Sequence, residues 1–449
     1  MLETFKNRLQ NDWQLFLANY WYGRKPIYTP EDPQWQDRSL SFVLVWLFLF
    51  GITLFFSPMP QDDLLRHIHA WQYDFDYRRM FDGYPYHFDA WFGFDWLVGH
   101  LYQSMGAFAI KLIQAASIGL FALAIYLNLK EAHRDTRVLV VLILVWAVGS
   151  RFLIARPTTF ETLFMFIAIG ITFYPLKPKW DMVIHLLLGC LMASFYHLFF
   201  IYLLPLIIWR RIYILPLIFG LAGWQWFTGG QYFKEVLDIL NFGAMRIPGI
   251  KVSENAFSLP LSLIFIGLVV LFVYKWRTSE KKWALTAAWF SLPMQIRYML
   301  DNLIPIVAIL LAREWKVRPH PFLILFMLVM VKVTLGNYGF YFSHEPKTPT
   351  KPYFEMHDHV MTQNLGVNFW VVNQGAQQLV KVAPAMEIGF SDKKIQQATL
   401  DNKVTCQFLH EFGFNKYVEN SAVGLPLPCL KLQASTPEGY KIWQVVPVK

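Results

Sequence analysis

Long apolar runs separated by short polar or basic connections make up most of this chain. A run needs about 17 to 25 helical residues to cross a hydrocarbon core of roughly 30 Å. Such runs are seeded at residues 42–56, 108–128, 138–154, 160–173, 182–195, 198–209, 213–227, 259–274, 283–294, 303–312 and 322–335. Each should be a helix, because lipid cannot satisfy free backbone groups. The pattern predicts a mainly α-helical polytopic membrane protein with about eleven transmembrane helices; tilted or broken helices remain open around His197 and Tyr298.

Composition and charge agree with this pattern. Of 449 residues, 55% are hydrophobic and only 16% are charged, which is more apolar side chain than a soluble core could bury. The net charge is +9, and the basic residues collect in alternate connections, which should therefore face the cytoplasm. They are Lys6, Arg8, Arg24, Lys25, Lys130, Arg134, Arg137, Lys177, Lys179, Arg210, Arg211, Lys275, Arg277, Lys281, Lys282, Arg313, Lys316 and Arg318. We interpret this charge as a topology signal and expect no nucleic-acid partner.

Three regions follow from this topology. Residues 1–40 are expected to form a cytoplasmic amphipathic segment without a cleavable signal, and residues 41–342 a transmembrane module. With the amino end inside and an odd number of crossings, the loop 57–107 and the tail 343–449 lie on the outer face. The tail is long enough to be a separate small domain.

The tail is expected to fold as an α+β or α/β domain. Alternating apolar positions at 368–372, 416–418 and 441–446 predict strands, and residues 404–412 predict a helix.

Two of the three cysteines, Cys406 and Cys429, lie in this tail, whereas Cys190 lies in a predicted span. An oxidising compartment would let the first two form a disulfide. Two buried free thiols are the alternative.

A pair of carboxylates, Asp62 and Asp63, follows the first predicted span. A helix over residues 62–71 would place Asp63, Arg66 and His67 on one face, since residues three and four apart are neighbours. A carboxylate beside a cation stays ionised and can accept a proton, so the arrangement suits a general base next to a phosphate clamp. The alternative is a pair of first-turn acids that stabilise a helix at the membrane interface.

Further cationic groups are predicted at outward turns. Arg151 and Arg156 flank the turn between the third and fourth spans, and His197 marks the next outward turn. Arg297 marks a later one, close to Asp301. Charged groups are costly near hydrocarbon and usually serve a site, so these side chains could together neutralise a phosphate headgroup. Snorkelling at helix ends is the alternative.

A divalent metal is an open question, and no cofactor is certain from the sequence. His67 and His69 are near the acid pair and offer nitrogen ligands. They point apart on a helix, so a shared ion would require an extended backbone.

These features together resemble the GT-C superfamily of membrane glycosyltransferases. The resemblance rests on the Asp62-Asp63 pair after the first span, Arg156-Pro157 at the outward end of the third, His197 at the third outward turn and the outer tail. It covers nearly the whole chain in layout, although its motifs are short. Members often have Glu as the second acid, so the Asp here leaves open which carboxylate acts as the base.

The resemblance implies transfer of a sugar from a polyprenyl-phosphate-linked donor to an acceptor hydroxyl, which could belong to a glycan, a lipid or a protein such as pilin. It implies catalytic roles for Asp62 and Asp63, and donor phosphate binding by Arg66, Arg151, Arg156, His197 and Arg297. The expected location is the bacterial inner membrane, with the lipid bilayer as a partner and the tail in the periplasm. The reaction should proceed with inversion, and a transporter or flippase of lipid-linked sugars is the main rival.

Overall fold

The computed structural model of the chain describes residues 34–57, 59, 60, 64–82, 84, 89–130, 132, 134–234, 236, 237, 266, 278–291, 299–314, 342, 343, 352–363, 365–384, 392–400, 403–420 and 427–447. Asp62, Asp63 and Arg297 lie outside these residues. So do the predicted run 322–335 and, apart from residue 266, the run 259–274.

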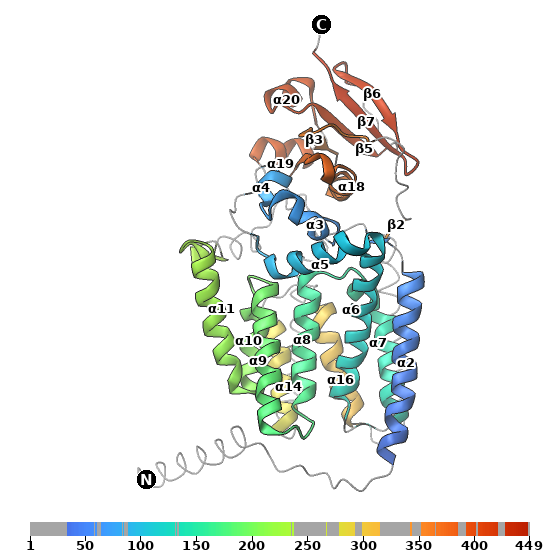
Figure 1. Cartoon of the computed structure of the whole chain (residues 1–449), viewed down its shortest axis with the longest axis vertical. Coiled ribbons are helices and arrows are strands. Elements are labelled where there is room, and N and C mark those ends of the chain that lie inside the picture. Colours follow the sequence, from blue (N-terminus) through green and yellow to red (C-terminus); the bar gives the residue numbers. More distant parts are fainter. Residues whose placement is uncertain are drawn as a thin grey trace.

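A bundle of roughly parallel helices forms the largest layer of the molecule (Figure 1). Its helices are α2 (Gln34–Phe56), α6 (Ala107–Asn128), α7 (Arg134–Leu153), α8 (Pro157–Ile171), α9 (Pro178–Phe195), α10 (Phe200–Trp209), α11 (Ile214–Phe227), α14 (Thr278–Ser291) and α16 (Ile304–Glu314). Helices α8 and α9 begin with Pro157 and Pro178, a residue whose fixed φ suits the first helical position. Short segments η2 (Arg211–Tyr213) and η3 (Met299–Leu303) lead into α11 and α16.

The helical nature of the predicted runs is confirmed where the structure describes them. By length and composition, however, only α6 among the described helices is long and apolar enough to cross a membrane. Shorter apolar helices lie at Phe42–Phe56, Pro157–Ile171, Phe200–Trp209 and Asp301–Leu310. The number of eleven crossings therefore stays a prediction.

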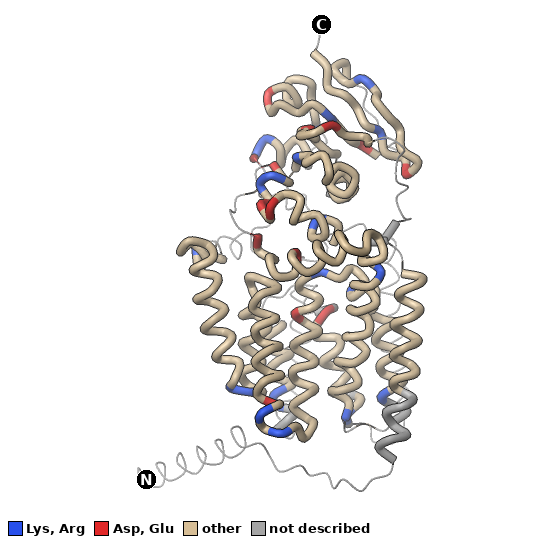
Figure 2. Tube along the Cα trace, in the orientation of Figure 1, with Lys and Arg blue, Asp and Glu red and all other residues tan. Residues whose placement is uncertain are grey.

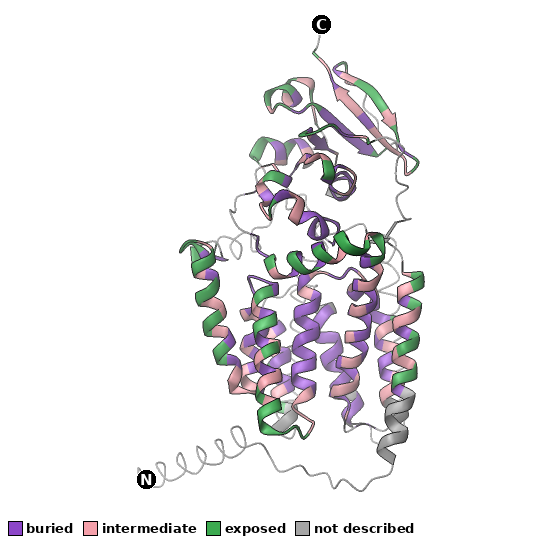
Figure 3. Ribbon diagram, in the orientation of Figure 1, coloured by how far each residue is buried: buried purple, intermediate pink, exposed green. Residues whose placement is uncertain are grey.

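The bundle buries its inner faces and leaves large apolar side chains on its perimeter (Figure 3). Helix α6 is central and packs against α2, α7 and α8. On the outer faces of α2 and α11, by contrast, Phe48, Phe56, Phe219 and Trp226 are 62%, 80%, 70% and 84% exposed.

A thin layer of short helices covers one end of the bundle (Figure 1). It consists of α3 (Leu64–His69), η1 (Ala70–Tyr73), α4 (Tyr77–Met80) and α5 (Phe92–Met105). Helix α5 lies across the bundle ends; it buries Phe94 and Asp95 on one face, while Trp96 is 50% exposed.

The tail 343–449 contains a five-stranded mixed sheet flanked by helices, which we call the outer domain after its predicted side of the membrane. Its strands are β3 (His359–Thr362), β4 (Lys381–Ala383), β5 (Lys416–Asn420), β6 (Leu430–Ser435) and β7 (Tyr440–Val445), in the order β4-β3-β5-β7-β6. Strand β3 is parallel to β4 and β5, and β7 is antiparallel to β5 and β6. Its helices are α18 (Leu365–Gly375), η4 (Ala376–Gln378), α19 (Lys393–Leu400) and α20 (Cys406–Glu411). A separate antiparallel pair joins β1 (Met59–Pro60) to β2 (Phe342–Ser343).

The predicted strands at 416–418 and 441–446 and the helix at 404–412 are confirmed as β5, β7 and α20. The strand predicted at 368–372 is wrong, because these residues lie within α18. Residues 367–372 are all buried, so burial shows neither the alternation of a strand nor a single helix face. The short apolar run satisfies both patterns, and packing against the sheet and α3 decides in favour of the helix.

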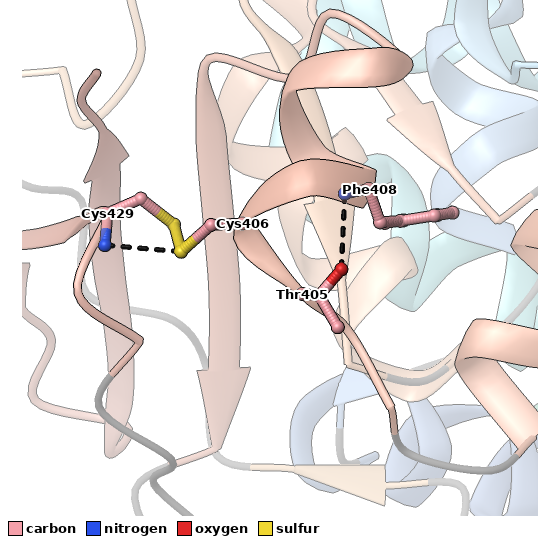
Figure 4. Close-up of a disulfide and its surroundings, with 4 residues drawn as sticks. All are labelled: Thr405, Cys406, Phe408 and Cys429. Carbon is pink, nitrogen blue, oxygen red and sulfur yellow. Dashed lines mark hydrogen bonds between the residues drawn. A yellow bond between two sulfur atoms is a disulfide. The ribbon is translucent and has the colours of Figure 1, made fainter. Parts of the chain in front are cut away.

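A disulfide joins Cys406 of α20 to Cys429, just before β6, as the sequence predicts (Figure 4). The Thr405 side chain caps α20 by accepting a hydrogen bond from the Phe408 N–H at 3.2 Å. The disulfide and the cap together fix the helix against the edge of the sheet.

Candidate functional site

A short buried helix carries the middle of the first predicted outer loop. Helix α3 begins at Leu64, directly after the acid pair, and all six of its residues are buried. It lies between α5 on the bundle side and α18 on the side of the outer domain (Figure 1). Contacts on both sides bury this segment, which carries one arginine and two histidines. Their polar groups therefore need partners within the protein.

His67 of α3 belongs to a hydrogen-bonded network with α5 and α4. Its Nδ1 lies 2.5 Å from Oδ1 of Asp95, and the Tyr77 hydroxyl donates to Oδ2 of the same carboxyl at 2.5 Å. His67 and Asp95 are fully buried, and Tyr77 is 1% exposed. The network therefore links three elements of the loop around one carboxyl group.

Arg66 and Asp89 complete this buried group. The guanidinium of Arg66 lies 4.2 Å from the ring centre of Trp91, a cation–π contact, and the side chain is 2% exposed. Asp89 is 1% exposed and accepts a hydrogen bond from the Trp91 N–H at 2.8 Å. We call Arg66, His67, Tyr77, Asp89 and Asp95 the loop cluster.

Burial shifts the protonation of the loop cluster. It raises the pKa of Asp95 well above its usual range, and the neighbouring Asp89 carboxyl raises it further. Burial likewise raises the pKa of Asp89 to about 7. Burial lowers the pKa of His67 well below its ordinary value, and the positive charges of Arg66 and Arg156 lower it further. Burial thus favours the protonated carboxyl of Asp95 and the neutral imidazole of His67, whereas the pKa of Asp89 lies near neutral pH.

Two of the predicted outward turns meet the loop cluster. The Nδ1 and backbone N–H of His197 lie 3.1 and 2.9 Å from the Ala90 carbonyl oxygen, and the His197 ring packs edge-on against Trp91. Arg156 follows Ala155, whose φ of +53° makes a tight turn between α7 and α8, and its charge acts on His67. The structure therefore brings both turns near the loop cluster, His197 through Ala90 and Trp91 and Arg156 through the effect of its charge on His67.

Arg151 is engaged differently. Its Nε and Nη2 donate to both carboxylate oxygens of Asp301 at 2.9 and 3.1 Å, which ties the end of α7 to η3. This bidentate pair balances the charge of Arg151 within the bundle. Nearby, Thr162 donates to Asn302 at 3.2 Å, so η3 is also joined to α8. Arg297 lies outside the described residues.

His67 and His69 do not share a ligand position. Both lie in helical α3, where His67 contacts Asp95 of α5 and His69 contacts Asn373 of α18. The extended backbone that a shared ion would need is not the conformation of this segment. Within the part of the chain that the structure describes, no three His, Cys, Asp or Glu side chains are grouped to hold a metal ion.

The sequence analysis assigned no role to Asp89 and Asp95. Neighbouring aromatic residues do not single them out, since Asp74 also stands between aromatic residues and its side chain is 74% exposed. Tyr77 carried no signal either, because its partner Asp95 is 18 residues away and becomes a neighbour only when the loop folds back.

Comparisons with known proteins give a distant structural likeness. No family model matches the chain, and no curated protein matches it. Over 87% of its length, the chain is similar to 69% of the Archaeoglobus fulgidus oligosaccharyltransferase, whose crystal structure is tethered with an acceptor peptide containing the NVT sequon. The sequence identity is 10% and the TM-score is 0.45.

Proposed function

We propose that this chain is an integral membrane glycosyltransferase of the GT-C type, which moves a sugar from a polyprenyl-phosphate-linked donor to an acceptor hydroxyl on the outer face. The observation that carries the proposal is the meeting of Arg156 and His197, from two turns of the bundle, with the loop cluster directly after the acid pair. Buried carboxyls with shifted pKa values beside fixed cations are a mark of catalytic sites.

The surface of the bundle supports a membrane location. Large apolar side chains cover the outer faces of α2 and α11, where water would be an unfavourable neighbour. Charged residues are sparse along the middle of the bundle, and basic residues lie at the end away from the outer domain (Figure 2). A basic cytoplasmic end and an outer domain in the periplasm would produce this distribution.

The proposed reaction is a displacement at the anomeric carbon. Asp62 or Asp63 takes the proton of the acceptor hydroxyl, whose oxygen bonds to the anomeric carbon from the face opposite the carrier. The bond from that carbon to the phosphate oxygen breaks, and its electron pair stays on the phosphate. Arg66 and Arg156 stabilise the charge that develops there. Attack from the opposite face inverts the sugar configuration.

The test uses membranes that contain the full chain, supplied with labelled polyprenyl-phosphate sugars and acceptor extracts. Asp62→Asn and Asp63→Asn are each assayed for sugar transfer, and loss of the general base should reduce the rate by about 100-fold or more. Asp74→Asn is the matched control, because this acid belongs to the same loop but its side chain is 74% exposed. Wild-type rates in both acid-pair variants would refute the assignment of the base. Carrier translocation without any transfer would favour the transporter.

A further inference from the structure

The outer domain contacts the chain on both sides of the acid pair. On the amino-terminal side, β1 pairs with β2 at the start of the tail, with Met59 opposite Ser343 and Pro60 opposite Phe342. On the carboxyl-terminal side, α3 packs against α18. Only residues 61–63 separate these two contacts in the sequence.

Polar contacts join the loop to α18 and to the segment before β4. Nε2 of His69, which is 4% exposed, lies 3.0 Å from Oδ1 of Asn373. Nδ1 of the same ring lies 2.9 Å from Oε1 of Gln72, so each ring nitrogen faces a side-chain amide, and the single N–H of a neutral ring donates to one of the two oxygens. The Tyr73 hydroxyl donates to the Val380 carbonyl at 2.9 Å. These bonds replace the water that the polar groups lost on burial.

The same loop also completes the edge of the sheet. Phe81 forms a parallel bridge with Val382 of the edge strand β4, and the Asp82 N–H donates to the Val382 carbonyl at 2.8 Å. The Asp82 carboxylate lies 2.9 Å from Nζ of Lys381 and 3.4 Å from Nε2 of His359. Backbone hydrogen bonding of this kind joins the loop to the edge strand of the outer domain, in the way that an added strand extends a sheet.

We propose that the outer domain is a positioning element of the active site, and that Asn373 acts through His69 to hold α3, and with it Arg66 and His67, in register with the rest of the loop cluster. This inference rests on the proposed function for its effect on catalysis. The structural part, the clamp on α3, does not depend on it. His69 lies three residues after Arg66 and two after His67, close enough for a small displacement of the helix to be felt at these side chains.

The test compares purified full-length variants in lipid nanodiscs. Asn373→Leu removes the oxygen that faces His69, and Asn373→Asp keeps an oxygen there. The leucine variant should lose about 10- to 100-fold in kcat with less than a threefold change in KM, because positioning affects the reaction step more than binding. The aspartate variant should keep most of the activity. Gln407→Leu, the same change at an exposed residue of α20, is the matched control and should behave as wild type.

A double-mutant cycle separates a clamp from general damage. If Asn373 acts through His69, then His69→Leu with Asn373→Leu should lose no more activity than the worse single variant. Multiplied losses in the double variant would overturn the proposal.

Hydrogen exchange of the α3 amides provides a readout that needs no sugar. Exchange should quicken in Asn373→Leu and stay slow in Gln407→Leu. Unchanged exchange in both variants would overturn the clamp, whereas an inactive wild type with the expected exchange pattern would overturn only the proposed function.

Discussion

At the scale of single residues, charge balance explains the composition of the loop cluster. Arg66 is charged at any relevant pH, and its burial requires a negative partner. Asp89 and Asp95 could supply two negative charges, one more than a neutral group needs. Burial raises the pKa of both carboxyls, and burial together with the charges of Arg66 and Arg156 lowers the pKa of His67, because a buried group favours its neutral form. The cluster therefore favours a protonated Asp95 beside a neutral His67.

This balance predicts how stability depends on pH. The pKa of Asp89 is raised to about 7, against about 4 in an unfolded chain, so its contribution to stability is complete below pH 4 and is lost as the pH rises through 7. Asp89→Asn does not titrate, and its amide oxygen can still accept the Trp91 N–H. The melting temperature of the variant relative to wild type should therefore rise between pH 4 and pH 7.5 in thermal unfolding.

The exposed Asp74→Asn variant is the control for that series and should follow the wild-type profile. A difference between Asp89→Asn and wild type that is constant across the same range would contradict the prediction.

The sequence identified the cations of the site more readily than its carboxyls. Arg66, Arg156 and His197 stand out because a charged residue beside an apolar run is costly. Asp89 and Asp95 lie in a loop rich in exposed-looking acids, and only the fold distinguishes them from Asp74 and Asp76. The partner of Arg151 could not be foreseen, since Asp301 is 150 residues away and is brought near by helix packing.

At the scale of elements, the position of α5 depends on a close approach to α9. A Cβ added at Gly93 would lie 2.4 Å from the backbone oxygen of Ser194, so this position tolerates only glycine without movement. Gly93 is in the first turn of α5, two residues before Asp95. The contact therefore fixes the carboxyl of the loop cluster relative to the bundle.

Gly93→Ala should accordingly push α5 away from α9. We expect a loss of about 1 to 3 kcal/mol in the free energy of unfolding, as for other overpacked sites, together with slower sugar transfer. Gly223→Ala is the matched control, because no atom lies within 4 Å of its added Cβ and the site is inside α11. It should gain up to about 1 kcal/mol from helix propensity. Chemical denaturation measures the free energy of unfolding of both variants. Equal changes in the two would refute the steric argument.

Element type followed from the sequence where one pattern dominated. The long apolar runs became helices, and β5 and β7 became strands, because each segment has one periodicity and one burial pattern. The strand prediction within residues 365–375 failed because their apolar run is short and carries β-branched residues. Packing between the sheet and α3 makes this segment a helix. Contacts between the loop and the outer domain were not predictable, since they join residues about 300 positions apart.

At the scale of the whole molecule, the bundle, the loop layer and the outer domain form three stacked layers (Figure 1). The loop cluster lies in the middle layer, where the bundle supplies cations and the outer domain closes over α3. A site at this junction would let a lipid-borne donor arrive from the bilayer and a water-borne acceptor from the other side. That arrangement requires the outer domain to be outside the cytoplasm.

Thiol labelling tests this orientation. The pairing of Cys406 with Cys429 requires an oxidising compartment, and Cys190 is exposed on α9 beside Leu187, which is 65% exposed.

In cells whose outer membrane is permeabilised, a membrane-impermeant maleimide should label no cysteine until reductant is added. It should then label two cysteines in the Cys190→Ser variant. Cys190 itself should react only after detergent solubilisation, because in the proposed membrane location lipid would cover that face of α9. Labelling of Cys406 and Cys429 without reductant, and only after the inner membrane is breached, would place the outer domain in the cytoplasm and remove the basis for transfer on the outer face.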